Sequence, residues 1–208
     1  MTSDFVGLAR KKRQADEPDT THVYFTGCSG NVAAGKYNDG TPEARVRLTQ
    51  RMYEGMVDSE RTLERRPVER VAWSAEPILL APNPAFTAEM LQQQIMNKSN
   101  AVAGRSRPAF TLAFLKRCEQ KIPIVLSALH IDDVTLLHLP AESFVEYQLR
   151  AQQAAPSRFV ATAAYGDGGP WYIPVKEAYP QGGYEASVAF SSDATDQRMT
   201  DGSRKLVS

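Results

Sequence analysis

Histidine, cysteine and long apolar runs are all scarce in this sequence of 208 residues. No stretch approaches the roughly 20 apolar residues that a membrane-spanning helix needs. The two cysteines, Cys28 and Cys118, exclude a disulfide framework, although their spacing leaves a single bridge open. The N-terminal residues lack a signal-peptide layout, because charged residues follow the apolar ones instead of preceding a long apolar core. These absences leave the localisation open.

The sequence also lacks net charge. Its 24 Lys and Arg balance 24 Asp and Glu, which gives no argument for nucleic acid or an acidic membrane surface as a partner. The basic run Arg10–Arg13 is followed by Asp16 and Glu17, a pattern typical of the solvated face of a helix. A hydrophobic content of 42% and a charged content of 23% are those of an ordinary soluble domain. We therefore expect one sizeable globular domain.

Caps, apolar periodicity and turn residues predict helices and strands that alternate without a strict β-α-β rhythm. This pattern indicates an α/β fold, a mixed layered domain with sheets flanked by helices. Ser3, Thr41 and Thr87 are expected as N-caps, with Pro42 at a first helical position. The expected helices cover residues 5–15, 42–65, 87–97, 110–120 and 140–153, and the expected strands 22–26, 71–81, 124–130, 134–139 and 158–164. Residues 98–108 are expected to form a mobile loop, and 131–133 a tight hairpin turn.

A glycine-rich loop, Gly27–Lys36, follows the first expected strand. Gly30 to Lys36 fits the phosphate-binding pattern G-x-x-x-x-G-K, which leaves a nucleotide-binding module as one hypothesis. Against it, Tyr37 stands where the magnesium-binding Ser or Thr would be, and residues 38–42 form a turn instead of a helix. The alternative is a structural turn in which the glycines adopt positive φ.

Two further segments contain chemically useful side chains. Glu142 lies where an expected strand ends and a helix begins, so it either favours the positive end of the helix dipole or ligates a metal. Residues 165–185 are rich in glycine, proline and aromatics, a composition typical of pocket walls or lids. The three histidines, His22, His130 and His138, form no complete metal motif, and His130 and His138 lie on the two arms of the predicted hairpin.

Taken in order, four blocks of the sequence resemble the neutral/alkaline ceramidase family. The blocks are Thr2–Gly7, Phe25–Gly35, Leu139–Glu142 and Tyr172–Glu185. The resemblance implies a zinc-dependent amidohydrolase, whose zinc is held by two His, one Glu and one Tyr.

On this resemblance Glu142 and Tyr172 match the family's zinc-ligating Glu and Tyr. Tyr184 matches a second family Tyr, which contacts the substrate carbonyl. Zinc would lower the pKa of its bound water to about 7, and a Tyr hydroxyl would stabilise the developing oxyanion. The implied substrate is an N-acyl amide, with a sphingolipid as one candidate.

The sequence departs from the family in two places. Both family histidines precede the block that begins here at Thr2, so the two His ligands are expected upstream of Met1, in a longer protein. Ala33 stands where the family has a functional Ser. We therefore expect residues 1–190 to be the C-terminal part of a ceramidase-like domain that is weakly active or inactive alone, followed by a polar tail over 191–208.

The alternative is a non-catalytic binding or structural remnant of the same domain. A missing N-terminal part would also leave sheet edges and apolar surface exposed. Proteins of the family are often secreted or membrane-associated, and the sequence gives no oligomeric state.

Overall fold

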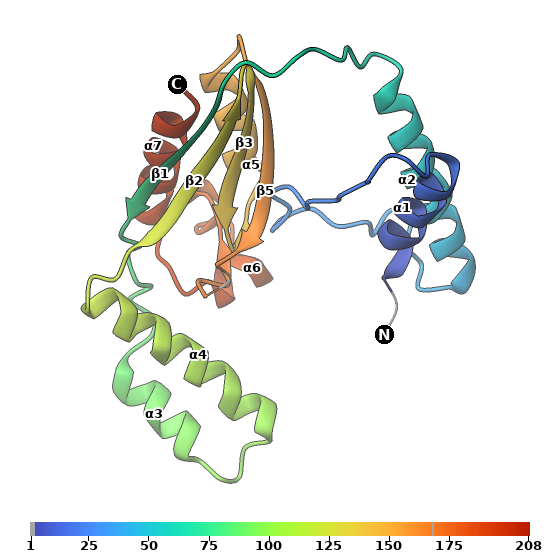
Figure 1. The fold of residues 1–208 in the computed structure, drawn as a ribbon. Coiled ribbons are helices and arrows are strands. Elements are labelled where there is room, and N and C mark those ends of the chain that lie inside the picture. The colour runs from blue at the N-terminus through green and yellow to red at the C-terminus, as the bar shows by residue number, and fades with distance from the viewer. Residues whose placement is uncertain (1–2, 168) are drawn as a thin grey trace. The chain divides into compact units, whose positions relative to one another are not determined.

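The computed structural model describes residues 3–167 and 169–208 (Figure 1). Met1, expected to be an internal start, Thr2 of the first ceramidase-like block, and Gly168 of the aromatic loop lie outside the described residues. The chain divides into two compact units. A helical unit comprises the chain up to Phe25 together with Ala33–Pro67, and a sheet unit comprises Thr26–Val32 together with Val68–Ser208.

Two helices, α1 (Asp4–Asp16) and α2 (Pro42–Glu60), form the helical unit. Thr41 caps α2 as expected, because its hydroxyl accepts a hydrogen bond from the Ala44 amide at 3.2 Å, and Pro42 opens the helix. Ser3 precedes α1, but its side chain makes no capping hydrogen bond. Helix α2 ends at Glu60, earlier than the expected residue 65.

The two helices pack side by side and run parallel to each other. The second half of α1 contacts the middle of α2, where the Tyr53 hydroxyl donates to an Asp16 carboxylate oxygen at 2.6 Å and Lys12 Nζ donates to Gln50 Oε1 at 2.9 Å. Ala9 of α1 and Ala44 of α2 are fully buried, so small side chains allow close approach of the helices.

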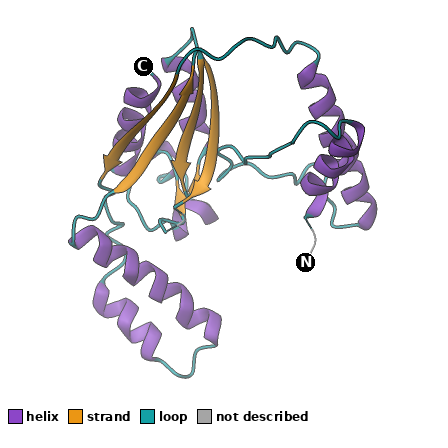
Figure 2. Ribbon diagram, viewed as in Figure 1, coloured by secondary structure: helices purple, strands orange, loops and turns teal. Residues whose placement is uncertain are grey.

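The sheet unit contains a four-stranded mixed sheet in the order β1-β2-β3-β5 (Figure 2). The strands are β1 (Val71–Ile78), β2 (Ile124–Ile131), β3 (Val134–Pro140) and β5 (Phe159–Gly166). β1, β2 and β3 pair antiparallel, and β3 pairs parallel with β5. The predicted hairpin is confirmed: Asp132 and Asp133 connect β2 to β3, with Asp132 at φ 51°. The mixed α/β fold class is therefore confirmed as well.

Two helices, α5 (Val145–Ala154) and α7 (Thr195–Val207), pack against each other and against this sheet (Figure 1). Residues 191–208 were expected to form a polar tail, yet α7 contributes Met199 and Val207 to the core of the unit. Buried side chains of this core include Leu126, Ala128, Leu137, Leu139, Tyr147, Val160, Ile173 and Phe190. The opposite side of β1 is uncovered: Val71 and Trp73 are about two-thirds exposed, at 63% and 65%.

A helical hairpin, α3 (Ala88–Met96) and α4 (Val102–Glu119), connects β1 to β2. Thr87 caps α3 as predicted, accepting from the Met90 amide at 3.2 Å. The mobile loop expected over 98–108 is wrong, because α4 already begins at Val102 and contains Pro108. The α3–α4 packing outweighs the hydrogen bond that Pro108 cannot donate.

Two other expectations are wrong. Residues 22–26 form no strand, and Val23 and Phe25 are exposed instead of paired. The helix expected from Pro140 begins only at Val145. Between them the chain forms a short strand, β4 (Glu142–Ser143), which pairs parallel with β6 (Tyr172–Ile173). Two-residue strands carry no periodicity, so the sequence pattern could not reveal this pair.

Both cysteines are free thiols with different accessibility. Burial raises the pKa of Cys28 to about 12, and burial also raises the pKa of the half-buried Cys118. We expect an aromatic disulfide reagent at pH 8 to modify the native protein slowly at Cys118 and not at Cys28, because only the thiolate attacks. Cys118→Ser should abolish the native reaction while Cys28→Ser leaves it unchanged. Rapid labelling of native Cys28 would contradict the burial of this thiol.

Candidate metal and substrate site

The β4–β6 pair places Glu142 beside Tyr172. The residue before each of them, Ala141 (φ 52°) and Trp171 (φ 63°), has a left-handed backbone conformation. The backbone therefore turns sharply just before each short strand. The Glu142 amide donates to the Trp171 carbonyl at 3.1 Å, which fixes the register between the two strands. The two residues matched to zinc ligands by the resemblance are therefore direct neighbours on adjacent strands.

The side chains of these two residues also interact. Burial, and after it hydrogen bonding with the Glu142 carboxylate, raises the pKa of Tyr172 to about 12. The phenol of Tyr172 is therefore protonated at neutral pH, where it serves as a donor to that carboxylate. The pair supplies two oxygen atoms from one small region of the surface.

Tyr184 contacts Tyr172 through its ring. The ring centroids are 5.9 Å apart with an interplanar angle of 80°, an edge-to-face arrangement. Tyr184 opens the short helix α6 (Tyr184–Val188), directly after Gly182 and Gly183, whose φ values of 77° and 97° suit glycine alone. The Tyr184 side chain is exposed. The structure thus brings all three residues selected from the sequence together.

Arg107 is part of this cluster and was missed by the sequence analysis. Its Nη2 donates to the Tyr184 hydroxyl at 2.7 Å, and its guanidinium lies 5.2 Å from the centre of the Trp171 ring. Arg107 was missed because residues 98–108 were expected to be a loop. Only its position on α4 reveals its proximity to Tyr184, and no sequence motif marks it.

The first part of the glycine-rich loop lies against β4. The Gly30 amide donates to the Ser143 carbonyl at 3.0 Å, and Asn31 Oδ1 accepts from the Val145 amide at 2.9 Å. Ser29 Oγ and the Tyr165 hydroxyl are 2.8 Å apart. Positive φ was expected for these glycines, but Gly30 does not adopt it. A Cβ on Gly30 would lie 2.3 Å from the Glu142 carbonyl oxygen, so close approach to β4 requires this glycine.

The second part of the loop, from Ala33, belongs to the helical unit. Ala33, at the family's Ser position, is exposed and offers only a methyl group. Lys36 Nζ lies 5.4 Å from the centre of the Tyr37 ring, and the next helix begins only at Pro42. No helix N-terminus therefore follows Lys36 in the way that a phosphate-binding loop needs.

The histidines lie in three different environments. His130 Nε2 is 2.9 Å from the Ser74 hydroxyl, and burial lowers the pKa of this imidazole. His138 packs against Gly166, where a Cβ would lie 1.9 Å from its Nε2. His22 forms a group with Glu17 and Glu60 in the helical unit. Over residues 3–167 and 169–208 this is the one group of three or more potential His, Cys, Asp or Glu ligands, and Glu142 belongs to no such group.

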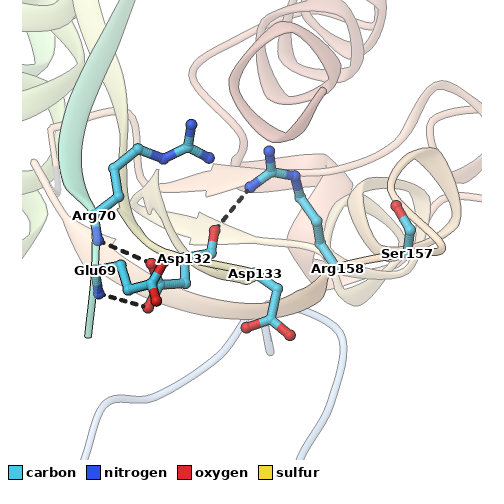
Figure 3. Close-up of a pocket in the computed structure, with 6 residues that line it drawn as sticks. All are labelled: Glu69, Arg70, Asp132, Asp133, Ser157 and Arg158. Atoms are coloured by element: carbon cyan, nitrogen blue, oxygen red, sulfur yellow. Dashed lines mark hydrogen bonds between the residues drawn. The ribbon is translucent and has the colours of Figure 1, made fainter. Parts of the chain in front are cut away.

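Two of the larger cavities in the described part of the sheet unit lie at opposite ends of β3. One of about 470 Å³ includes Phe144 and Glu185 in its lining, so it borders the candidate site. The other, of about 500 Å³, lies at the opposite end of β3 (Figure 3). There the Asp132 carboxylate accepts from the amides of Glu69 and Arg70 at 3.2 and 2.9 Å, and Arg158 Nη1 donates to the Asp132 carbonyl at 3.4 Å. These bonds anchor the entry to β1, a structural role.

The fold of this chain is similar to that of solved ceramidases. A neutral ceramidase from Pseudomonas aeruginosa matches 100% of this chain and 40% of its own, with a TM-score of 0.61 and 14% identity. A ceramidase complexed with C2 matches 100% of this chain and 42% of its own, with a TM-score of 0.61 and 12% identity.

The chain thus spans about two-fifths of the length of these solved structures. At such low identity the likeness shows a ceramidase-like fold and nothing finer. A scan of protein-family models and a comparison with curated protein sequences found no match to this sequence. No helix in the described part of the chain has the length and apolar character needed to cross a membrane.

Proposed function

We propose that this chain forms part of a zinc-dependent amidohydrolase site of the neutral/alkaline ceramidase type. Residues 1–190 would contribute to the catalytic domain. Glu142 and Tyr172 would ligate zinc, and Tyr184 would contact the carbonyl of an N-acyl amide, with a sphingolipid as the candidate substrate. The observation that carries the proposal is the cluster itself: Glu142 and Tyr172 pair across β4 and β6, and the Tyr184 ring packs on Tyr172.

The residues fit part of a zinc site. A carboxylate and a phenol oxygen are both suitable ligands, and the β4–β6 pairing holds their backbones at one register. Two oxygen ligands are half of the four that a protein zinc site normally has. We therefore expect zinc to bind weakly here in the isolated chain, with hydrolysis weak or absent.

The side chains would divide the work as follows. Zinc, when bound, would polarise a carbonyl and activate a water molecule. The Glu142 carboxylate holds the Tyr172 phenol in place, and metal binding would displace that phenol proton. The exposed Tyr184 hydroxyl accepts from Arg107, so its own proton is free to be donated to an oxyanion. Arg107 would thereby act as a positioning residue for Tyr184.

Tyrosine-selective NMR during zinc titration tests the two ligands. The titration is run in a His22→Gln background, which removes the histidine of the Glu17/His22/Glu60 group. We expect the ring signals of Tyr172 and Tyr184 to shift with zinc at submillimolar to millimolar affinity. Glu142→Gln should weaken this response at least tenfold, because it replaces a charged ligand with a neutral one.

Glu119→Gln is the matched control, since Glu119 is an exposed carboxylate at the end of α4. It should leave the zinc response of Tyr172 unchanged. The ligand assignment would be refuted if zinc left the Tyr172 signal unmoved, or if Glu142→Gln and Glu119→Gln responded alike.

A non-catalytic binding function is the second candidate, and the small ligand set favours it. Only Glu142 and Tyr172 carry the proposed metal chemistry in the cluster, whereas the Arg107, Trp171 and Tyr184 side chains already form an aromatic and cationic surface. Binding of a short-chain N-acyl amide that is insensitive to zinc and lost in Arg107→Ala would favour this reading over hydrolysis.

A further inference from the structure

A second cluster of metal-ligating side chains lies in the helical unit, separate from Glu142 and Tyr172. Glu17 directly follows α1, Glu60 is the last residue of α2, and His22 lies in the segment after α1. One ligand atom from each of the three side chains lies within 4.8 Å of the others. Residues distant in sequence thus place two carboxylates and one imidazole around a single point.

The imidazole of His22 points to a missing ligand. Its side chain is only 10% exposed, and its Nε2 is buried without a hydrogen-bond partner. The nearest carboxylate oxygen, Glu17 Oε2, is 3.8 Å away, which is too far for a hydrogen bond. Leaving a buried polar nitrogen unpaired costs free energy, so such an atom in a native protein calls for a partner.

The backbone of His22 is anchored in the position that directs this imidazole. Its amide donates to Gln14 Oε1 at 3.3 Å, and its carbonyl accepts from Arg10 Nη1 at 3.3 Å. Both partners belong to α1, so the segment that lacks the expected strand is held by side chains of that helix. The backbone that carries the imidazole is therefore held before any ion arrives, which lowers the entropic cost of binding one.

Arg13 holds the two carboxylates. Its guanidinium donates to Glu17 Oε1 and to both oxygens of Glu60. Glu17 Oε2 is left facing His22, so one oxygen of Glu17 can serve Arg13 while the other serves an ion. Glu60 would have to release one of its two bonds to Arg13. Arg13 is thus both an organiser of the carboxylates and a competitor for one of them.

We propose that Glu17, His22 and Glu60 bind a divalent transition metal of the zinc class, through His22 Nε2 and one oxygen of each carboxylate. One imidazole nitrogen and two carboxylate oxygens suit Zn²⁺, and water would complete a four-coordinate shell. The two carboxylates supply two negative charges for the dication, and the positive charge of Arg13 offsets one of them. The ion would join the end of α1 to the end of α2, a structural role independent of the proposed amidohydrolase site.

Calorimetric titration of Zn²⁺ into the full chain at pH 7 tests the site. We expect one site that binds at least tenfold more tightly than any other, and its loss in His22→Gln. A Glu142→Gln/Tyr172→Phe variant should keep this site, which separates its fate from that of the proposed function. Nitrogen NMR of the wild-type imidazoles should show the zinc-dependent shift at Nε2 of His22, a readout that needs no variant to fold.

Arg13→Gln supplies a test in the opposite direction. Removing the competing cation should tighten zinc binding several-fold, provided that circular dichroism shows both helices intact. The proposal is overturned if His22→Gln retains the tight site, if no tight site exists in the wild type, or if the zinc-dependent shift falls on His130 or His138 instead of His22.

Discussion

Phe190→Ala is expected to destabilise the protein by about 3–5 kcal/mol, the range for removing a buried aromatic ring. Phe190 is 2% exposed and stands at the centre of three ring contacts. Its ring stacks on Trp171 with centroids 5.8 Å apart, lies 5.9 Å from Phe114, and meets the edge of Phe86 at 6.5 Å.

The effect should extend beyond global stability, because Phe114 lies on α4 and Trp171 directly precedes β6. Urea unfolding measures the free-energy change, and Trp fluorescence reports the packing of Trp171. Phe110→Ala, at a 61% exposed position of the same helix α4, is the matched control and should change stability by no more than about 0.5 kcal/mol. Equal destabilisation by the two variants would show that Phe190 does not hold these elements together.

Local signals in the sequence were sufficient for much of the fold. Thr41 and Thr87 cap helices because each has an extended backbone, and its hydroxyl accepts a hydrogen bond from a free amide of the first helical turn. The β2–β3 hairpin was predicted because two apolar runs flank Asp132 and Asp133, and an aspartate tolerates the left-handed conformation at the turn. Such features depend on neighbours in sequence, which a single chain displays directly.

The errors lie where tertiary packing decides. Residues 98–108 were expected to form a mobile loop, but α4 begins at Val102 and accommodates Pro108 because α3 packs alongside. Residues 22–26 were expected to form a strand, yet the backbone amide and carbonyl of His22 bond to the side chains of Gln14 and Arg10 instead of to a neighbouring strand. No periodicity in the segment contains that information.

In the candidate site too, the sequence identified residues but not their arrangement in space. Glu142, Tyr172 and Tyr184 were selected through the ceramidase resemblance, and residue spacing alone gave no reason to place them together. Their proximity depends on a two-residue strand pair and on an edge-to-face ring contact, both of which join residues distant in sequence. Arg107 depends on the same tertiary arrangement but matches no motif, so it could be found only in the structure.

Gly30→Ala is expected to cost about 1–3 kcal/mol, as overpacking of a well-packed site does. The added Cβ would lie 2.3 Å from the Glu142 carbonyl oxygen and 3.0 Å from Phe144 Cδ1, and the first of these is backbone that cannot rotate away. Either the loop or β4 must move, and the 3.0 Å hydrogen bond from Gly30 to Ser143 is weakened. Gly35→Ala is the matched control, because a Cβ there meets nothing within 4 Å.

Gly30→Ala should also change the pKa of Tyr172, through a displacement of Glu142. If β4 shifts, the Glu142 carboxylate withdraws from the phenol, and the pKa of Tyr172 should fall from about 12 towards its ordinary value near 10. Urea unfolding and tyrosine-resolved pH titration measure the two effects, and Gly35→Ala should leave the titration unchanged and the stability equal or slightly higher. If Gly30→Ala matched Gly35→Ala in both measurements, the loop would not support Glu142. If Gly30→Ala lowered both the stability and the pKa of Tyr172, the close approach of Gly30 to β4 would be shown to determine the geometry of the proposed ligands.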